Sequence, residues 1–361
     1  MNLFEMFEVL EDPRDIKGKK YKLIDILIMT IYGLLCGLKD YVNIADFMKL
    51  KEDYFTKLLN LEKRYTISWL SFWCFCCYWQ EIVKNRTGQN ISIDGKAIKS
   101  ATDKINNGNI PYIVSAGEIG LSIGQVNVDD KSNEITAIPD LLDLLEIEGA
   151  TITIDAIGTQ EDIVNKIIGK HAHYVLPVKD NQRELRKQIK SQFDSYNNLY
   201  GSKNVLHKKT LEKDHGRIEE REYFLCYDVS KIKDKIKWKT VNAIAYTKVS
   251  KTCGDETIIT ENYYIIDYLI DIEKLIETIR DHWNIECGLH WKLDVILDED
   301  HSKNRVANSI DNLSIMRKII FNLASLDNSF GKVPLQRKLT RYMLDFKNIE
   351  KLIFEIIPSI S

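Results

Sequence analysis

The chain has 361 residues, of which 29% are charged and 44% are hydrophobic. This composition is that of an ordinary globular protein, which excludes collagen-like, mucin-like and disordered chains, and the length fits two or three domains. The net charge is −3, so the whole-chain balance does not indicate a nucleic-acid-binding protein. Residues 201–251, however, carry thirteen basic and seven acidic side chains, and a local patch of this kind is what would contact a polyanion.

The N-terminal segment, residues 1 to about 63, has apolar residues at helical spacing and is predicted to be helical. Its apolar run 23–38 includes Asp25 and is shorter than the roughly 20 residues of a membrane-spanning helix, so we expect a buried core helix and no membrane partner. Basic residues cluster around the turn at Arg14, where they form either a solvated face or a phosphate contact. Cys74 and Cys77 have the C-x-x-C spacing, and we expect the seven cysteines to be free thiols in a reducing cytoplasm.

From Asn90 the pattern changes to short apolar strands that end at polar or glycine turns, with helical stretches between them. Strands that alternate with helices predict an α/β sheet layer. The expected strands, with their closing turn residues, are 91–95, 112–115, 151–155 and 173–177, and the expected helices are 138–145, 160–169 and 181 to about 196.

Residues 205–266 are predicted to be β-rich, because β-branched and aromatic residues dominate two stretches within them, 221–227 and 241–249. The stretch Lys231 to Lys239 alternates, so as a strand it would place five lysines on one face, although the same letters also suit a helix end or a loop. The last part, residues 272–357, is amphipathic and predicted to be helical.

Two aspartates, Asp94 and Asp155, each close a predicted strand and precede a turn. Sites in α/β proteins are usually built at the carboxyl ends of strands, although an aspartate after a strand is also a common turn former. A third acid, Glu286, falls in a stripe with Ile279 and Leu293 that follows helical spacing, so we expect it to face the core. A buried carboxylate needs a cation or a metal, and an ion pair with a nearby basic residue is the alternative.

Three carboxylates from two strands and a helix would make an oxygen-rich site suited to Mg²⁺ or Mn²⁺. Two such ions can activate water or a 3′-hydroxyl and stabilise the leaving oxygen of a phosphodiester. The pattern therefore predicts metal-dependent phosphoryl transfer. No Walker loop or H-E-x-x-H competes with this interpretation, and the pair His171 and His173 opens an apolar strand, which favours a structural role.

A series of short motifs runs through most of the chain in order: Ile93-Asp-Gly-Lys96, Lys131 to Pro139, Thr153-Ile-Asp-Ala156, Val178-Lys-Asp-Asn-Gln182, His215-Gly-Arg-Ile-Glu219 and Arg280-Asp-His-Trp-Asn-Ile-Glu286. With these motifs the chain resembles the DDE transposases of bacterial insertion sequences, and within them the ISAs-type group. The N-terminal Leu10-Glu-Asp-Pro-Arg14 resembles the associated N-terminal domain of that group.

The resemblance implies an α/β fold with an RNase H-like catalytic core, a β-rich insertion before the catalytic glutamate, and a helical N-terminal domain. The implied boundaries are 1–89 for the helical domain, 90–200 for the first part of the core, 201–268 for the insertion and 269–361 for the C-terminal part of the core. Asp94, Asp155 and Glu286 map onto the catalytic, metal-binding acids. The candidates for contacts to nucleic acid are Lys96, Arg217, Arg280, His282 and Lys292.

The implied activity is a DNA transposase that cuts the ends of its element and joins the 3′-hydroxyl strands to target DNA, using two Mg²⁺ or Mn²⁺ ions. Its partners would be double-stranded DNA, both terminal inverted repeats and target, and further copies of the chain in a homodimer or larger synaptic complex. We expect a cytoplasmic, nucleoid-associated bacterial protein. The alternatives are an RNase H-like nuclease or resolvase, and a catalytically disabled remnant that only binds DNA.

The sequence departs from the family in several places. The usual words after the first aspartate and after the glutamate are replaced by Lys96-Ala-Ile-Lys99 and Cys287-Gly288, and the related tyrosine-arginine-glutamate-lysine pattern is not met around Glu286. The stretch 64–80 is rich in Trp and Cys. It is either a genuine hydrophobic helix or the product of a frameshift with a compensating deletion, and the coding DNA decides between them.

Overall fold

The computed structural model describes residues 2–8, 10, 21–61, 88–98, 112–118, 120–128, 134–196, 199–214, 217–232, 237–302 and 307–355. The contacts divide the chain into two compact units. The first unit comprises Met1–Asn85, Gly95–Leu145 and Glu286–Ser361, and the second comprises Arg86–Asp94 and Glu146–Ile285.

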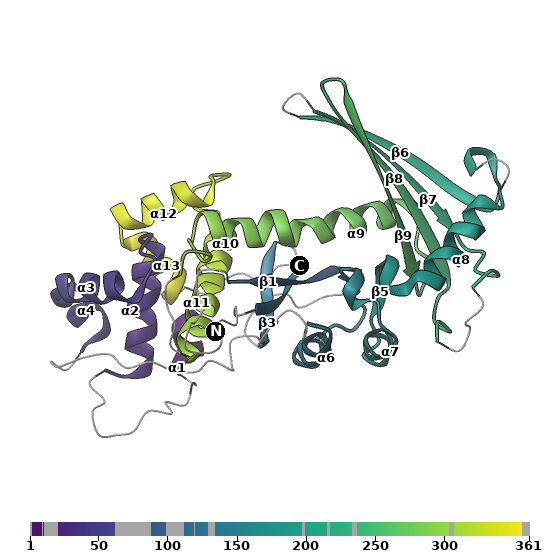
Figure 1. The fold of residues 1–361 in the computed structure, drawn as a ribbon. Coiled ribbons are helices and arrows are strands. Elements are labelled where there is room, and N and C mark those ends of the chain that lie inside the picture. Colours follow the sequence, from purple (N-terminus) through teal and green to yellow (C-terminus); the bar gives the residue numbers. More distant parts are fainter. Residues whose placement is uncertain are drawn as a thin grey trace. The chain divides into compact units, whose positions relative to one another are not determined.

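The helices of the first unit come from both ends of the chain (Figure 1). Every residue of α2 is buried, as predicted for the apolar run, and α2 packs against α1, α3, α11, α12 and α13. No helix in the described ranges is both long and apolar enough to cross a membrane. The helices are α1 (Leu3–Glu8), α2 (Leu23–Leu35), α3 (Tyr41–Leu50), α4 (Glu52–Leu59), α10 (Trp291–Val295), α11 (Ala307–Leu326), α12 (Leu335–Leu344) and α13 (Lys347–Phe354).

The first unit also contains an antiparallel hairpin of β2 (Tyr112–Glu118) and β3 (Leu121–Val128), on which α6 (Glu134–Leu144) packs. Helix α11 packs against β3 as well. The sequence analysis predicted β2 and α6 but not β3, whose glycine and polar residues dilute the strand pattern.

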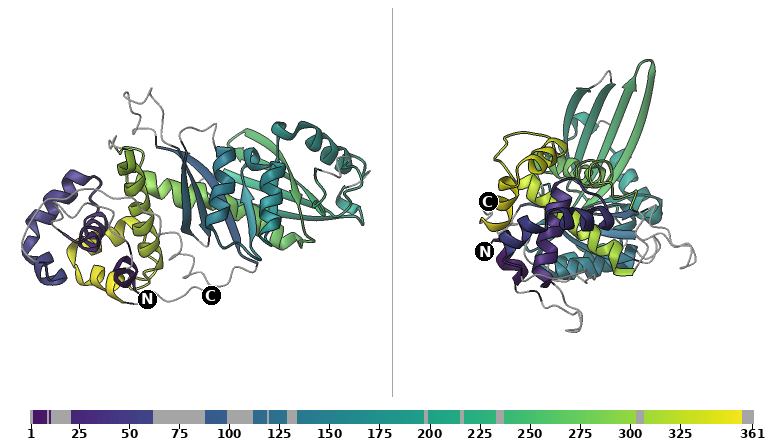
Figure 2. Two further views of the ribbon diagram at one scale, coloured as in Figure 1. Left: turned by 90° about the horizontal axis from the view of Figure 1, so that it is seen from below. Right: turned by 90° about the vertical axis from the view of Figure 1, so that its left-hand side faces the viewer.

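The second unit is built on a mixed sheet with strand order β1-β4-β5-β9-β8-β7-β6. Strands β1, β4 and β5 are parallel, and the others are antiparallel to their neighbours. The long strands β6 to β9 stand out in Figures 1 and 2. The strands are β1 (Asn90–Ala97), whose last residues belong to the first unit, β4 (Thr151–Ile154), β5 (His173–Val178), β6 (Val205–Asp214), β7 (Arg217–Cys226), β8 (Ala243–Cys253) and β9 (Glu256–Ile266).

Three helices belong to the second unit: α7 (Glu161–Gly169), α8 (Arg183–Asp194) and α9 (Ile272–Asn284). Helix α9 packs its apolar side against the sheet, where Leu275 and Ile279 join a buried cluster with Tyr223 and Leu225 of β7. Short 3-10 turns lie at Ala156–Gly158, Asp180–Gln182 and Leu199–Gly201, and a π-helix at Ile285–His290 follows α9.

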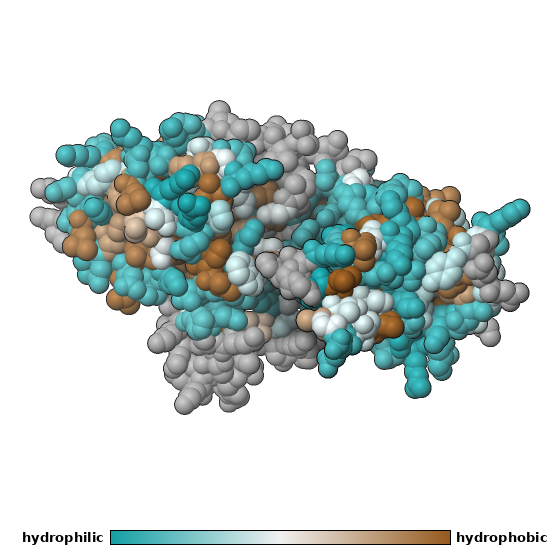
Figure 3. Space-filling model, turned by 90° about the horizontal axis from the view of Figure 1, so that it is seen from above, coloured by the Kyte–Doolittle hydropathy of each residue, from teal (hydrophilic) through white to brown (hydrophobic). Residues whose placement is uncertain are grey.

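The predicted strands and helices of the middle region are confirmed, with shifted ends. The alternating stretch 231–239 is different, because its described residues, 231–232 and 237–239, form turns, so the strand with five lysines on one face was wrong there. Trp238 within it is buried, which explains why apolar letters alternate with lysines without a strand. On the face drawn in Figure 3, hydrophobic side chains occur in small groups among hydrophilic ones.

Candidate active site

Asp94 and Asp155 follow the last paired residues of two neighbouring parallel strands. The register pairs Ile93 of β1 with Ile154 of β4, so each aspartate is the next residue after the last paired position. Neighbouring strands lie about 4.8 Å apart, and side chains at matched positions share a face. The prediction that each acid closes a strand is confirmed for Asp155 and wrong for Asp94, because β1 continues to Ala97.

A ladder of polar side chains leads up to the two aspartates along the face covered by α9. The matched pairs Asn90 with Thr151 and Ser92 with Thr153 precede Asp94 with Asp155 at two-residue steps, so all three pairs point to the same side. Thr278 of α9 donates from Oγ1 to Asn90 Oδ1 over 3.0 Å. We call these three pairs the polar rows of the α9 face.

His282 of α9 continues this ladder. Its Nδ1 lies 3.1 Å from Thr153 Oγ1, and Thr153 Oγ1 donates to Ser92 Oγ over 3.1 Å. Ser92 Oγ in turn donates to the backbone oxygen of Asp281 over 3.4 Å. The imidazole is therefore tied to the row just before the two aspartates.

The electrostatics show that these groups act on one another. Burial, together with the negative charge of Asp94, raises the pKa of Asp155, although its hydrogen bond from the Ile157 amide opposes the shift. Burial also lowers the pKa of His282; the charges of Asp94 and Asp155 oppose this, while Lys179 adds to it. His282 is therefore neutral near pH 7, beside a carboxylate pair whose repulsion a bound cation would relieve.

The turn that holds Asp155 is anchored on both sides. The Asp155 carboxylate accepts from the Ile157 amide over 2.9 Å, as an N-cap does. Asn181 Nδ2 donates to the backbone oxygen of Ala156 over 2.5 Å, and Gln182 Nε2 to that of Thr159 over 3.0 Å. These contacts explain why the polar residues Asn181 and Gln182 follow β5.

Glu286 differs from its sequence-based expectation, because its side chain is exposed and so is Trp283 before it. Trp283 is already exposed within α9, so the predicted stripe leaves the buried side before the π-helix Ile285–His290 begins. The apolar residues that are buried after α9 are Ile285, Leu289, Leu293 and Leu297. The prediction that Glu286 faces the core was therefore wrong.

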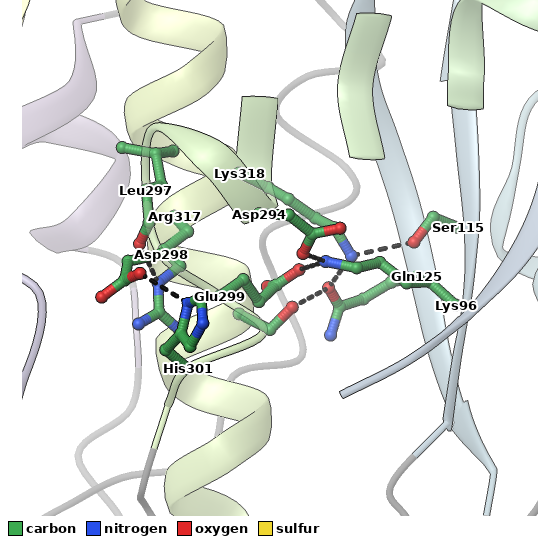
Figure 4. A network of polar contacts seen from close by, with 11 residues as sticks. Lys96, Ser115, Gln125, Asp294, Leu297, Asp298, Glu299, His301, Arg317 and Lys318 are labelled. Atoms are coloured by element: carbon green, nitrogen blue, oxygen red, sulfur yellow. Dashed lines mark hydrogen bonds and ion pairs between the residues drawn. The ribbon is translucent and has the colours of Figure 1, made fainter. Parts of the chain in front are cut away.

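Lys96, one of the predicted contacts to nucleic acid, makes ion pairs within the protein. Its Nζ lies 2.6 Å from Glu299 Oε2 and also pairs with Asp294, and the side chain is only 11% exposed. Lys318 Nζ donates to Ser115 Oγ over 2.9 Å in the same network (Figure 4). Arg317 completes this group, which we call the Lys96 cluster: Lys96, Asp294, Glu299, Arg317 and Lys318.

The Lys96 cluster holds a fully buried carboxylate in its charged form. Burial alone would raise the pKa of Glu299, but the positive charges of Lys96, Lys318 and Arg317 outweigh it and lower the pKa to about 2. Gly95, which precedes Lys96, has no room for a side chain, because a Cβ there would lie 2.4 Å from the Tyr112 ring. Steric and charge constraints therefore fix this end of β1.

The other basic candidates are partly engaged. Arg280 pairs with Glu212, and Arg217 pairs with Glu219. Lys292 lies with its Nζ 5.3 Å from the centre of the Phe321 ring. The basic character of residues 201–251 is likewise tempered by ion pairs on strands β6 to β8, among them Lys209 with Glu220, Arg221 with Glu212 and Glu219, and Lys251 with Glu219.

Sequence reasoning missed three participants, Lys179, Ser92 and Thr153. Lys179 directly follows β5, whose register with β4 brings its end to the edge that carries Asp155. The available signal was its position after the third parallel strand. The hydroxyl residues sit two positions before each aspartate, a spacing that places them on the same face. The basic turn at Arg14 and the stretch 64–80 lie outside the described residues.

Asp94 and Asp155 suit a hard divalent cation, because both side chains are carboxylates and follow matched positions on neighbouring strands. In the described ranges, no group of three or more His, Cys, Asp or Glu side chains is already arranged around a metal position. The pair Asp94 and Asp155 therefore fits as part of a metal site.

Comparisons with known proteins agree over nearly the whole chain. A family model described as "Transposase DDE domain" matches residues 93–323, and a model described as "DDE_Tnp_1-associated" matches residues 4–70. From Escherichia coli strain K12, "Putative protein YbfL" and "H repeat-associated putative transposase YhhI" are each 32% identical over 364 residues, covering 95% of this chain and 95% of the relative.

A further relative, "Putative transposase YncI" of Escherichia coli O157:H7, is 32% identical over 371 residues, which is 98% of this chain and 94% of the relative. The matched family region begins at the strand of the first aspartate and extends beyond Glu286. Together with the paired aspartates on the α9 face, these matches show that the chain belongs to the DDE transposase family.

Proposed function

We propose that this chain cleaves the ends of its own insertion sequence and transfers the 3′-hydroxyl strands to target DNA by two-metal phosphoryl transfer. The observation that carries this proposal is the pair Asp94 and Asp155, which directly follow the last paired residues of β1 and β4, Ile93 and Ile154. Two like charges beside each other at a partly buried position favour a divalent cation. Bound Mg²⁺ or Mn²⁺ would supply charge stabilisation at the phosphodiester.

Glu286 is proposed as the third ligand. The resemblance to the family supports this assignment, because Glu286 closes the matching motif that runs from Arg280 to Glu286. Its exposed side chain suits a ligand that must meet metal and DNA.

The finer organisation follows from the same proposal. Parallel strands β1, β4 and β5, with α7 connecting the last two, support an RNase H-like core, and β6 to β9 support the insertion at 201–268. We propose membership of the ISAs-type group, the predicted four-part division, and a nucleoid-associated location. Joining two ends to target DNA requires a homodimer or larger synaptic complex, with terminal inverted repeats as the recognised DNA.

The experiment is cleavage of a DNA fragment that carries the flanking ends of the gene, with Mg²⁺ or Mn²⁺, by the wild-type chain and Asp155→Asn. We expect metal-dependent nicking at the ends that falls at least about 100-fold in Asp155→Asn, since losing even an outer partner of a metal ligand costs 10- to 100-fold. Asp162→Asn, on the exposed start of α7, removes the same charge and should cleave normally.

The competing functions give different results. Salt-sensitive binding to the ends without cleavage would indicate a disabled DNA-binding remnant. Metal-dependent cleavage that ignores the end sequences, with no strand transfer, would indicate an RNase H-like nuclease or resolvase.

A further inference from the structure

The hydrogen bonds around His282 have a fixed direction. Each hydroxyl carries a single proton. The backbone oxygen of Asp281 can only accept, so the Ser92 proton is committed to it and the Thr153 proton is committed to Ser92. Thr153 Oγ1 must therefore accept from His282 Nδ1, 3.1 Å away. His282 then carries its proton on Nδ1 and leaves Nε2 as an acceptor.

The position of the His282 ring indicates the role of Nε2. Nδ1 contacts Thr153, which lies two residues before Asp155 on the same face, so the ring lies next to the carboxylate pair. The charges of Asp94, Asp155 and Lys179 act on the imidazole in agreement with this position. A clamp on phosphate would need a positively charged ring, which burial disfavours. A neutral ring with a free lone pair instead accepts a hydrogen bond from an O–H group.

Resting on the proposed function, we propose that His282 is a catalytic residue whose Nε2 accepts a hydrogen bond from the attacking water or 3′-hydroxyl and orients it towards the phosphodiester. Thr153 and Ser92 are the positioning residues that select the tautomer. The oxygen of the nucleophile forms a bond to phosphorus while the bond from phosphorus to the leaving oxygen breaks. The nucleophile loses its proton to solvent and the leaving oxygen takes one from solvent, so the imidazole only holds the nucleophile.

The first test is the tautomer itself, which needs no activity. With ¹⁵N-labelled histidine, the ring signals of His282 are assigned by their absence in His282→Asn, and the nitrogen shifts report which nitrogen carries the proton. We expect the Nδ1–H form in the wild-type chain and a shift towards the Nε2–H form in Thr153→Val, which lacks the acceptor. An Nε2–H form in the wild-type chain would overturn the proposal.

The second test separates the two nitrogens. The amide of Asn can replace the Nδ1 donor, and the longer Gln can place an acceptor near Nε2. We expect His282→Asn to fold and bind the ends as tightly as wild type but to cleave about 10- to 100-fold more slowly in a single turnover. His282→Gln should recover a large part of that loss.

The outcomes remain distinguishable. Full cleavage by His282→Asn would show that the histidine is not catalytic. If His282→Asn and His282→Gln lose cleavage to the same extent, and both also lose thermal stability, the histidine only supports the fold. If the wild-type chain itself does not cleave its ends, the proposed function fails, while the nitrogen shifts still decide the tautomer.

Discussion

The carboxylate pair of the α9 face and the Lys96 cluster both contain acidic groups that are at least partly buried, yet the pKa values of these groups are shifted in opposite directions. The pKa of Glu299 is lowered because three cations surround it, and the pKa of Asp155 is raised because burial acts together with a neighbouring aspartate. Burial is common to both, so the neighbouring charges decide the outcome. In the Lys96 cluster cations surround the acids, which stabilises the fold, whereas two acids adjoin each other in the pair, which we propose binds a cation.

The largest expected effect is the loss of stability when Glu299 of the Lys96 cluster is neutralised. Glu299→Gln leaves Lys96, Arg317 and Lys318 without their shared anion, and removing one partner of a buried pair costs about 3 to 5 kcal/mol. Urea denaturation measures the free energy of unfolding. Glu184→Gln removes an exposed pair with Lys187 on α8 and should not change it detectably. A loss no greater than that control would mean that the cluster does not stabilise the fold.

Asp155→Asn should stabilise the metal-free protein, whereas Glu299→Gln should destabilise it. Neutralising this side chain removes the repulsion from Asp94, and the Asn oxygen can still accept from the Ile157 amide. We expect a small rise in the melting temperature of the metal-free protein, measured by calorimetry. A clear fall would show that the aspartate is structural, and the comparison with Glu299 would no longer hold.

The pH dependence of stability sharpens the comparison. The pKa of Glu299 is about 2 in the folded chain against an ordinary value of 4.5, so its contribution is complete above about pH 4.5 and is lost as the pH falls towards 2. Within this window one group contributes a slope of about 1.4 kcal/mol per pH unit. Unfolding measured at steps from pH 5 to 3 should be less steep in Glu299→Gln, and identical slopes would contradict the assigned charge state.

The smallest effect is expected for exposed pairs on the long strands. Arg280→Ala breaks the ion pair with Glu212, in which both side chains are more than 40% exposed. The loss should be less than about 1 kcal/mol of stability. If Arg280 contacts phosphate, the salt dependence of DNA binding should fall by about one unit of slope. Glu212→Gln frees the guanidinium and should strengthen binding; unchanged slopes in both variants would remove Arg280 from the interface.

Sequence patterns predicted the elements that carry the site because their signals are local. Alternation and closing turn residues gave the strands that lead to Asp94 and Asp155, and helical spacing gave α9. The pairing of β1 with β4 depends on contacts between residues about 60 positions apart. The sequence therefore could not predict that Ser92, Thr153 and Lys179 lie near the two aspartates.

Charge patterns were less informative. The excess of basic residues in 201–251 suggested a polyanion surface, but strand pairing sets Arg221 and Lys251 against Glu219. Lys96 follows the Asp-Gly turn like a phosphate ligand, yet the fold brings Asp294 and Glu299 to it from about 200 residues away. A composition count cannot see such neutralisation, because it depends on which strands become neighbours.

The π-helix after α9 also changes how relatives should be aligned. A wide turn holds one residue more than an ordinary one, so positions beyond it are displaced by one in the helical count. A residue that faces the same way as Glu286 two turns later is expected eight positions on, at Asp294, and not seven positions on, at Leu293. A search for a partner acid or lysine at a fixed interval from Glu286 would therefore examine the wrong column, and a single-residue gap placed within 285–290 is the correction that the geometry prescribes.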